Sequence, residues 1–139
     1  MRVSVLIGLA LIGAGSVPAV AATCDAEINK GVAQLGTHNT RMEAAVKQAK
    51  SLSDEAQKKE PADMPTLRKA HAQLRIACRE GQQAVKVGDR ILTVAKRPSC
   101  GREADKVAAF DKSVAEMKKS VGDLCTEVSN VEKQLKGGR

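Results

Sequence analysis

Six cationic side chains recur at regular spacing between residues 68 and 97 of this 139-residue chain. Successive members lie 7, 4, 7, 4 and 7 residues apart, which on a helix places all of them within a sector of about 60°. No acidic residue shares that sector, and Glu80 and Asp89 lie on its outer flanks. Guanidinium groups bind phosphate and carboxylate well, so the pattern predicts an anion-binding face. The six residues, here called the basic strip, are Arg68, Arg75, Arg79, Lys86, Arg90 and Arg97.

From residue 22 onward, the excess of positive charge is confined to the segment that carries the basic strip. Residues 22–60 hold six cations and six acids, residues 103–139 hold seven of each, and residues 61–102 hold nine cations and three acids. One interpretation is a solvated face, because a helix buried on two sides must expose its third and long cationic stems cover apolar flanks well. The other is a binding face, because a surface that serves solubility alone usually mixes both signs.

The chemistry of the strip limits the partners that it could bind. An anionic lipid surface, an acidic glycan or an acidic protein would each match a line of guanidinium groups. Nucleic acid fits less well, because Phe110 is the single aromatic residue of the chain and stacked bases would find no platform. Membrane insertion fits least, since no aromatic anchor is available and the apolar helix faces are needed in a core.

The sequence contains no pattern of residues typical of catalysis. No nucleophile stands beside a base, no carboxylate pair has a local reason for a shifted pKa, and no phosphate-binding loop occurs, so we expect a protein that is not an enzyme. A haem or copper site could use His38, Met42 and His71 in a bundle core. These residues lack a carboxylate or cysteine partner at fixed spacing, so ordinary hydrogen-bonded histidines are favoured and no cofactor is expected.

Four cysteines occur without a CxxC motif, which favours structural disulfides over redox-active or metal-binding thiols. In an antiparallel bundle, Cys24 and Cys100 fall at one end. Helix rise places Cys78 and Cys125 at heights of about 26 and 33 Å above that end. A bond between Cys100 and Cys125 within one straight helix would far exceed the Cα separation of about 6 Å that a disulfide allows. The predicted pairs are therefore Cys24 with Cys100 and Cys78 with Cys125, each contributing about 4 kcal/mol in the chain-entropy model.

Apolar periodicity predicts three helices, over about residues 24–52, 65–96 and 102–136. The chain has no Trp or Tyr, so Ala, Val, Leu, Ile and Met must form the core, which suits helix packing better than a small sheet. The predicted fold is an all-α, up-down-up three-helix bundle with coiled-coil-like packing. The first seam reads Ile28, Val32, Leu35, Asn39, Met42, Val46, Ala49, and the third reads Val107, Phe110, Val114, Met117, Val121, Leu124, Val128, Val131, Leu135.

Local signals refine these helices. Gly31, Gly36 and the polar run after it are weak helix formers, so the first helix is expected to kink or loosen near its middle. Asn39 on the seam is either a register device or part of a solvated turn. Whether the first helix continues through residues 53–60 stays open. Asp63 is the predicted cap of the middle helix, ahead of Pro65.

The first 21 residues have the features of a secretory signal. Arg2 precedes an apolar run, and Ala19-Val20-Ala21 offers the small residues that signal peptidase needs. The apolar run is shorter than the roughly 20 residues that span a bilayer, and the residues before Cys24 match a lipoprotein signal poorly. We therefore expect export to the periplasm or the extracellular space as one helical domain, residues 22–136, followed by a disordered tail at residues 137–139.

Two hypotheses for function follow from these features. The first is a small exported, non-catalytic helical module that engages an anionic surface or an acidic partner through the basic strip. The alternative is a structural or chaperone-like interaction protein that forms a homo-oligomer through its long C-terminal helix.

Overall fold

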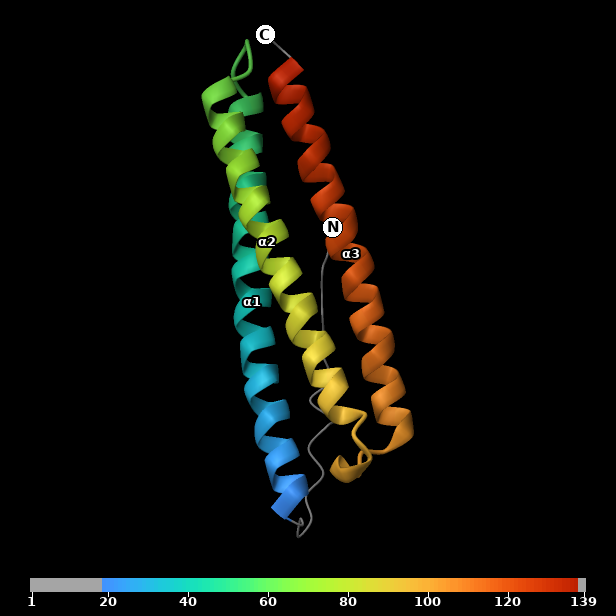
Figure 1. Cartoon of the computed structure of the whole chain (residues 1–139). Coiled ribbons are helices and arrows are strands. Elements are labelled where there is room, and N and C mark those ends of the chain that lie inside the picture. The colour runs from blue at the N-terminus through green and yellow to red at the C-terminus, as the bar shows by residue number, and fades with distance from the viewer. Residues whose placement is uncertain (1–18, 138–139) are drawn as a thin grey trace.

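The computed structural model describes residues 19–137, and the chain forms three helices that run up, down and up (Figure 1). The all-α bundle predicted from periodicity is confirmed. Most of the predicted signal segment, and the last two residues of the predicted tail, lie outside the described residues. The elements are α1 (Ala19–Gln57), α2 (Met64–Ala95), a short 3-10 helix η1 (Pro98–Cys100) and α3 (Ala104–Gly137).

α1 is longer and more regular than its sequence suggests. It continues five residues beyond the predicted end at 52, to Gln57, because Ala56 is fully buried and its carbonyl accepts a hydrogen bond from the Asp63 amide at 3.2 Å. The expected loosening near its middle was wrong, since α1 is helical throughout. The hydroxyls of Thr37 and Thr40 donate to carbonyls one turn earlier, so these side chains are satisfied within the helix.

α2 begins and ends at recognisable signals. Asp63 caps its start as predicted, because its side chain accepts a hydrogen bond from the Thr66 amide at 3.3 Å. The helix ends at Ala95, and Arg97 has the extended dihedrals φ −64° and ψ 125°. Arg97 therefore lies just beyond the helix, close to the predicted end at 96, and does not share the regular helix face that its spacing in the strip implied. Gly101, in the left-handed region at φ 59°, then lets the chain reverse toward α3.

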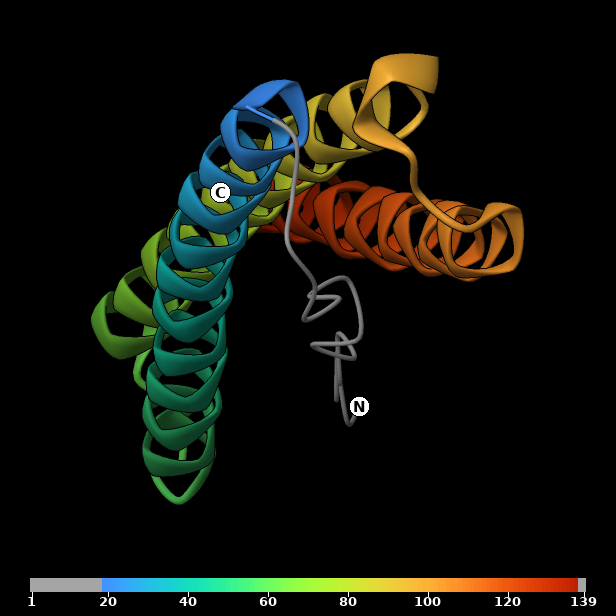
Figure 2. The ribbon, with the colours of Figure 1, turned by 90° about the horizontal axis from the view of Figure 1, so that it is seen from below.

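α2 is the central helix and packs against both of the others, more extensively against α1 than against α3. Seen along the bundle, α1 and α3 diverge from each other (Figure 2). The predicted seams supply the core. Leu35 of α1, Ala84 of α2 and Val114 of α3 are almost completely buried. A Cβ on Gly81 would lie 2.9 Å from Val121 and 3.1 Å from the Met42 sulfur, so this glycine allows side chains from both neighbours to reach α2.

Two disulfides tie the helices together in the pattern that helix heights predicted. Cys24 bonds Cys100 and joins the start of α1 to η1, while Cys78 bonds Cys125 and joins α2 to α3. Structural disulfides form and persist in oxidising compartments outside the cytosol, so the folded chain belongs to such an environment. Among the described helices, none has a stretch long and apolar enough to cross a membrane.

Candidate anion-binding face

The side of α2 that faces away from the core carries the basic strip, and all six strip residues are exposed to solvent. Ala77 and Ala84, on the opposite side of the helix, have no exposed surface. The five strip residues from Arg68 to Arg90 project from α2 at intervals of one or two turns. Arg97 follows after the helix ends, so five members share one helix face and the sixth extends that line into the connection to η1.

The two acidic residues on the flanks of the strip are each engaged by a side chain from a neighbouring helix. Glu80 accepts a 2.7 Å hydrogen bond from Nδ1 of His38 on α1. Asp89 forms a 2.7 Å ion pair with Lys118 of α3. The hydrogen bond from His38 lowers the pKa of Glu80; burial opposes the shift, and the charges of Arg41 and Arg79 support it. Neither carboxylate therefore has to be neutralised by the strip itself.

Only Arg97, among the strip residues, has an ion-pair partner within residues 19–137. Its guanidinium lies 2.9 Å from the Glu27 carboxylate of α1, and the other five strip cations form no ion pair within the described chain. The charge of Arg75 lowers the pKa of Glu132, but the two side chains do not form an ion pair. That carboxyl has a lowered pKa chiefly because Lys136 donates a hydrogen bond to it.

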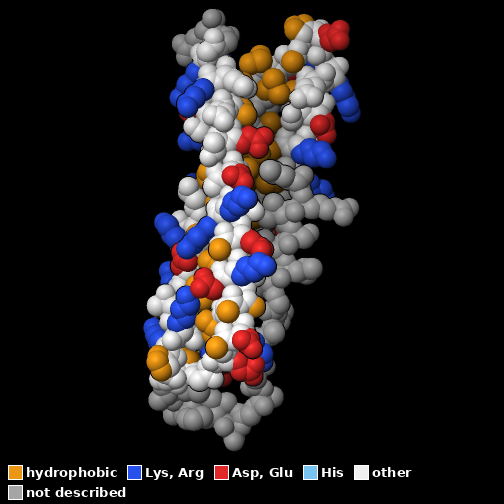
Figure 3. Space-filling model, turned by 90° about the vertical axis from the view of Figure 1, so that its right-hand side faces the viewer, with side chains coloured by type: hydrophobic (Ala, Val, Ile, Leu, Met, Phe, Trp, Pro, Cys, Tyr) orange, Lys and Arg blue, Asp and Glu red, His pale blue; other side chains and the backbone are white. Residues whose placement is uncertain are grey.

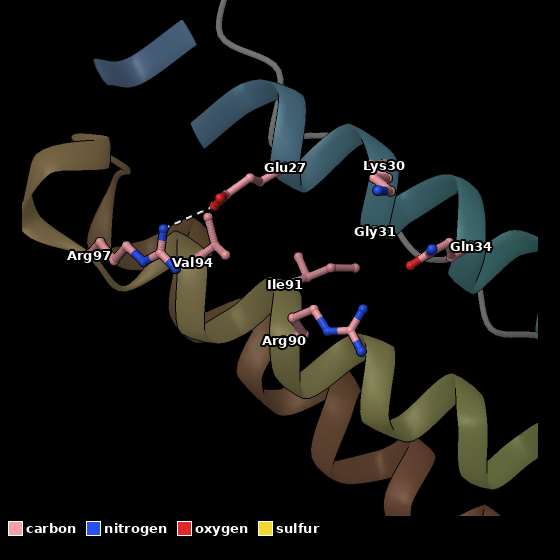
Figure 4. A pocket seen from close by; sticks show the side chains of 8 residues that line it. All are labelled: Glu27, Lys30, Gly31, Gln34, Arg90, Ile91, Val94 and Arg97. Carbon is pink, nitrogen blue, oxygen red and sulfur yellow. Dashed lines mark hydrogen bonds and ion pairs between the residues drawn. The ribbon is translucent and has the colours of Figure 1, made fainter. Parts of the chain in front are cut away.

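A notch of about 280 Å³ opens between α1 and α2 at the Arg97 end of the strip. In Figure 4, Arg90 and Gln34 extend toward the same space from opposite helices, and Glu27 and Arg97 close its other end. The residues that line the notch are Glu27, Lys30, Gly31, Gln34, Arg90, Ile91, Val94 and Arg97.

Close approach of the two helices shapes this notch. A Cβ on Gly31 would lie only 2.5 Å from Cγ1 of Ile91, so the missing side chain at Gly31 lets α1 lie directly on α2. Lys30 and Gln34, which flank Gly31 on α1, are thereby brought to the same space as Arg90. Sequence analysis did not single out Lys30 or Gln34, because their relation to the strip depends on how α1 is rotated against α2.

The histidines have separate structural roles. Nε2 of His71 lies 3.0 Å from the Val128 carbonyl and joins α2 to α3, so this nitrogen carries the donated hydrogen. His38 is engaged with Glu80. Residues 19–137 contain no group of three or more histidine, cysteine or acidic side chains that could hold a metal ion.

The distribution of charge differs between faces of the molecule. In Figure 3, Lys and Arg side chains recur along the left-hand edge, whereas both signs alternate on the face turned toward the viewer. The mixed face resembles an ordinary solvated surface. No protein-family model matches the chain, and neither a curated protein nor a solved structure shows significant similarity to it.

Proposed function

We propose that this protein is a small exported, non-catalytic helical module that binds an anionic surface through the basic strip. The observation that carries the proposal is the exposure of all six strip residues, five of them without a carboxylate partner in the described chain. Cations near an anionic membrane surface contribute about 1 kcal/mol each. A line of this kind is therefore sufficient for measurable binding without any enclosed pocket.

The shape of the strip supports an extended anionic partner. Arg68 to Arg90 span about 33 Å at the helical rise of 1.5 Å per residue, and Arg97 extends the line beyond the helix. The strip lies on the outer side of the central helix, so it meets a flat array of charges more readily than a single small ligand. The anionic lipid head groups of a membrane that faces the periplasm or the cell exterior fit this geometry best. An acidic glycan or an acidic protein would be recognised by the same guanidinium groups.

Charge reversal within the strip tests the proposal. Retention on anionic liposomes and on heparin is measured at rising salt for the wild type and for the triple variant Arg75→Glu, Arg79→Glu, Arg90→Glu. A matched control reverses three exposed lysines of α3 that form no ion pair in the described chain: Lys112→Glu, Lys119→Glu, Lys133→Glu. We expect the strip variant to elute at much lower salt than the control. Equal elution of the two variants would contradict the proposal.

A second candidate is a structural or chaperone-like role through self-association. Figure 3 shows apolar side chains between the two projecting ends at the top of the molecule, where α3 and the α1–α2 hairpin terminate. Leu67, Leu74, Val131 and Leu135 are only partly buried, so a second copy could cover them. Light scattering over a wide concentration range tests this candidate, and a monomeric mass throughout would exclude self-association.

A further inference from the structure

We propose that the notch between α1 and α2 binds a terminal phosphate group, that is, a phosphate monoester in preference to a phosphodiester. This inference rests on the proposed anion binding by the basic strip. It specifies the chemical class of the anion and the place on the protein where it binds. It joins two strip residues, Arg90 and Arg97, to Lys30 and Gln34 of α1, which lie outside the strip.

The size of the notch suits one small anionic group. Its volume is about 280 Å³, which is at the lower limit of the range of about 300–1,000 Å³ typical of pockets for drug-sized ligands. The same volume is several times the roughly 30 Å³ that one water molecule occupies in the liquid. A single phosphate group with a few waters therefore fits. The open side lets the rest of a larger molecule remain in solvent.

Charge balance selects the monoester. The lining contains three cations and one carboxylate, so it carries a formal net charge of +2. The cations are Lys30, Arg90 and Arg97, and the carboxylate is Glu27. A terminal phosphate carries about −1.5 to −2 at neutral pH and neutralises this lining, whereas a phosphodiester or a carboxylate carries about half that charge. Glu27 also fixes Arg97 through their 2.9 Å ion pair, so that guanidinium is already held at the rim.

The donors are arranged on two sides, which matches the three free oxygens of a terminal phosphate. Arg90 offers a planar pair of N–H donors from α2. Lys30 adds a point charge and the Gln34 amide adds a neutral donor, both from α1. Figure 4 shows Arg90 and Gln34 approaching this space from opposite helices, with the apolar side chains of Ile91 and Val94 on the side toward Glu27 and Arg97. A diester has fewer free oxygens and cannot satisfy both helices equally.

Two kinds of vesicle test the inference in the oxidised protein. Phosphatidylcholine vesicles contain either phosphatidic acid, a monoester, or phosphatidylglycerol, a diester, and are matched in surface potential. We expect about tenfold tighter binding to phosphatidic acid, the size of one additional hydrogen bond to a charged group. Lys30→Ala and Arg90→Ala should abolish this preference. The control Arg79→Ala on the strip should weaken binding to both vesicles, the control Lys47→Ala on α1 should weaken binding to neither, and both should leave the preference intact.

A soluble probe distinguishes a lipid head group from free phosphate. Inorganic phosphate should shift the backbone amide resonances of Gly31 and Ile91 saturably in the wild type and not in Lys30→Ala. Such shifts with equal binding to both vesicles would support a soluble phosphate monoester as the source. Equal binding to both vesicles without these shifts would overturn the notch proposal and leave the strip proposal standing. Absence of binding to either vesicle would instead contradict the proposed function itself.

Discussion

Glu80 of α2 accepts a 2.7 Å hydrogen bond from His38 of α1, and both side chains are partly buried between the two helices. The hydrogen bond is the main reason that the pKa of Glu80 lies below its ordinary value, against the opposing effect of burial. The pair joins α1 to α2 and also engages a carboxylate on the flank of the basic strip.

Replacing this carboxylate should change how stability depends on pH. A carboxyl whose pKa is lower in the folded state contributes stability above its unfolded pKa, about 4.3 for Glu, and loses it as pH falls through the folded value. Glu80→Gln should therefore be less stable than the wild type at about pH 6, and the difference should shrink at about pH 2.5. Urea unfolding followed by circular dichroism measures the stability of both proteins at both pH values. Glu43→Gln, at an exposed position of α1 without an ion pair, is the control, and a difference independent of pH would contradict the assignment.

Two glycines of α1 should respond oppositely to alanine. A Cβ at Gly31 would meet Ile91 at 2.5 Å, whereas a Cβ at Gly36 would have nothing within 4 Å. Both substitutions gain helix propensity of up to about 1 kcal/mol, but overpacking costs about 1–3 kcal/mol. Gly31→Ala should therefore have a free energy of unfolding about 1–3 kcal/mol below that of Gly36→Ala, and Gly36→Ala should exceed the wild type. Denaturant titration measures the ranking, and equal stabilities would show that α1 does not lie closely against Ile91.

The disulfide between Cys78 and Cys125 should matter most for α3. It closes a separation of 47 residues, and its removal costs about 4 kcal/mol in the chain-entropy model, a large part of the 5–15 kcal/mol typical of small domains. Because α3 packs on α2 less extensively than α1 does, its amides should lose protection first. Hydrogen exchange of Cys78→Ala with Cys125→Ala measures this order. Equal loss of protection in α1 and α3 would argue against an independently released α3.

Properties that depend on the helical rise and period could be predicted from sequence. Both disulfide pairs followed from heights along the bundle, because helix rise per residue varies little. The apolar seams followed for the same reason, and Phe110, Val114 and Met117 are buried as their spacing indicates. The end of α1 could not be predicted from sequence. Residues 53–60 are polar, and the burial of Ala56 depends on how α1 and α2 close into a hairpin.

The candidate site was predictable only where it lies on one helix. The strip required the period of α2 alone, whereas the notch depends on the rotation of α1 about its own axis. Arg97 is a residue for which a signal was present in the sequence. It precedes Pro98, and a residue before proline is driven away from helical dihedrals, which agrees with its extended conformation. Its ion pair with Glu27, 70 residues away, has no counterpart in local sequence.

Charge and guanidinium geometry can be separated in the part of the strip that lies outside the notch. Replacing Arg68, Arg75 and Arg79 with glutamine removes three charges and should weaken binding to anionic vesicles by about 3 kcal/mol, or roughly 100-fold, at about 1 kcal/mol per cation. Replacing the same residues with lysine keeps the charge and loses the planar fork. Because these side chains are exposed and form no ion pair in the described chain, long-range attraction should dominate. The lysine variant should then bind within about threefold of the wild type in a vesicle sedimentation assay. A lysine variant as weak as the glutamine variant would show that the strip recognises its partner through bidentate contacts and not through charge.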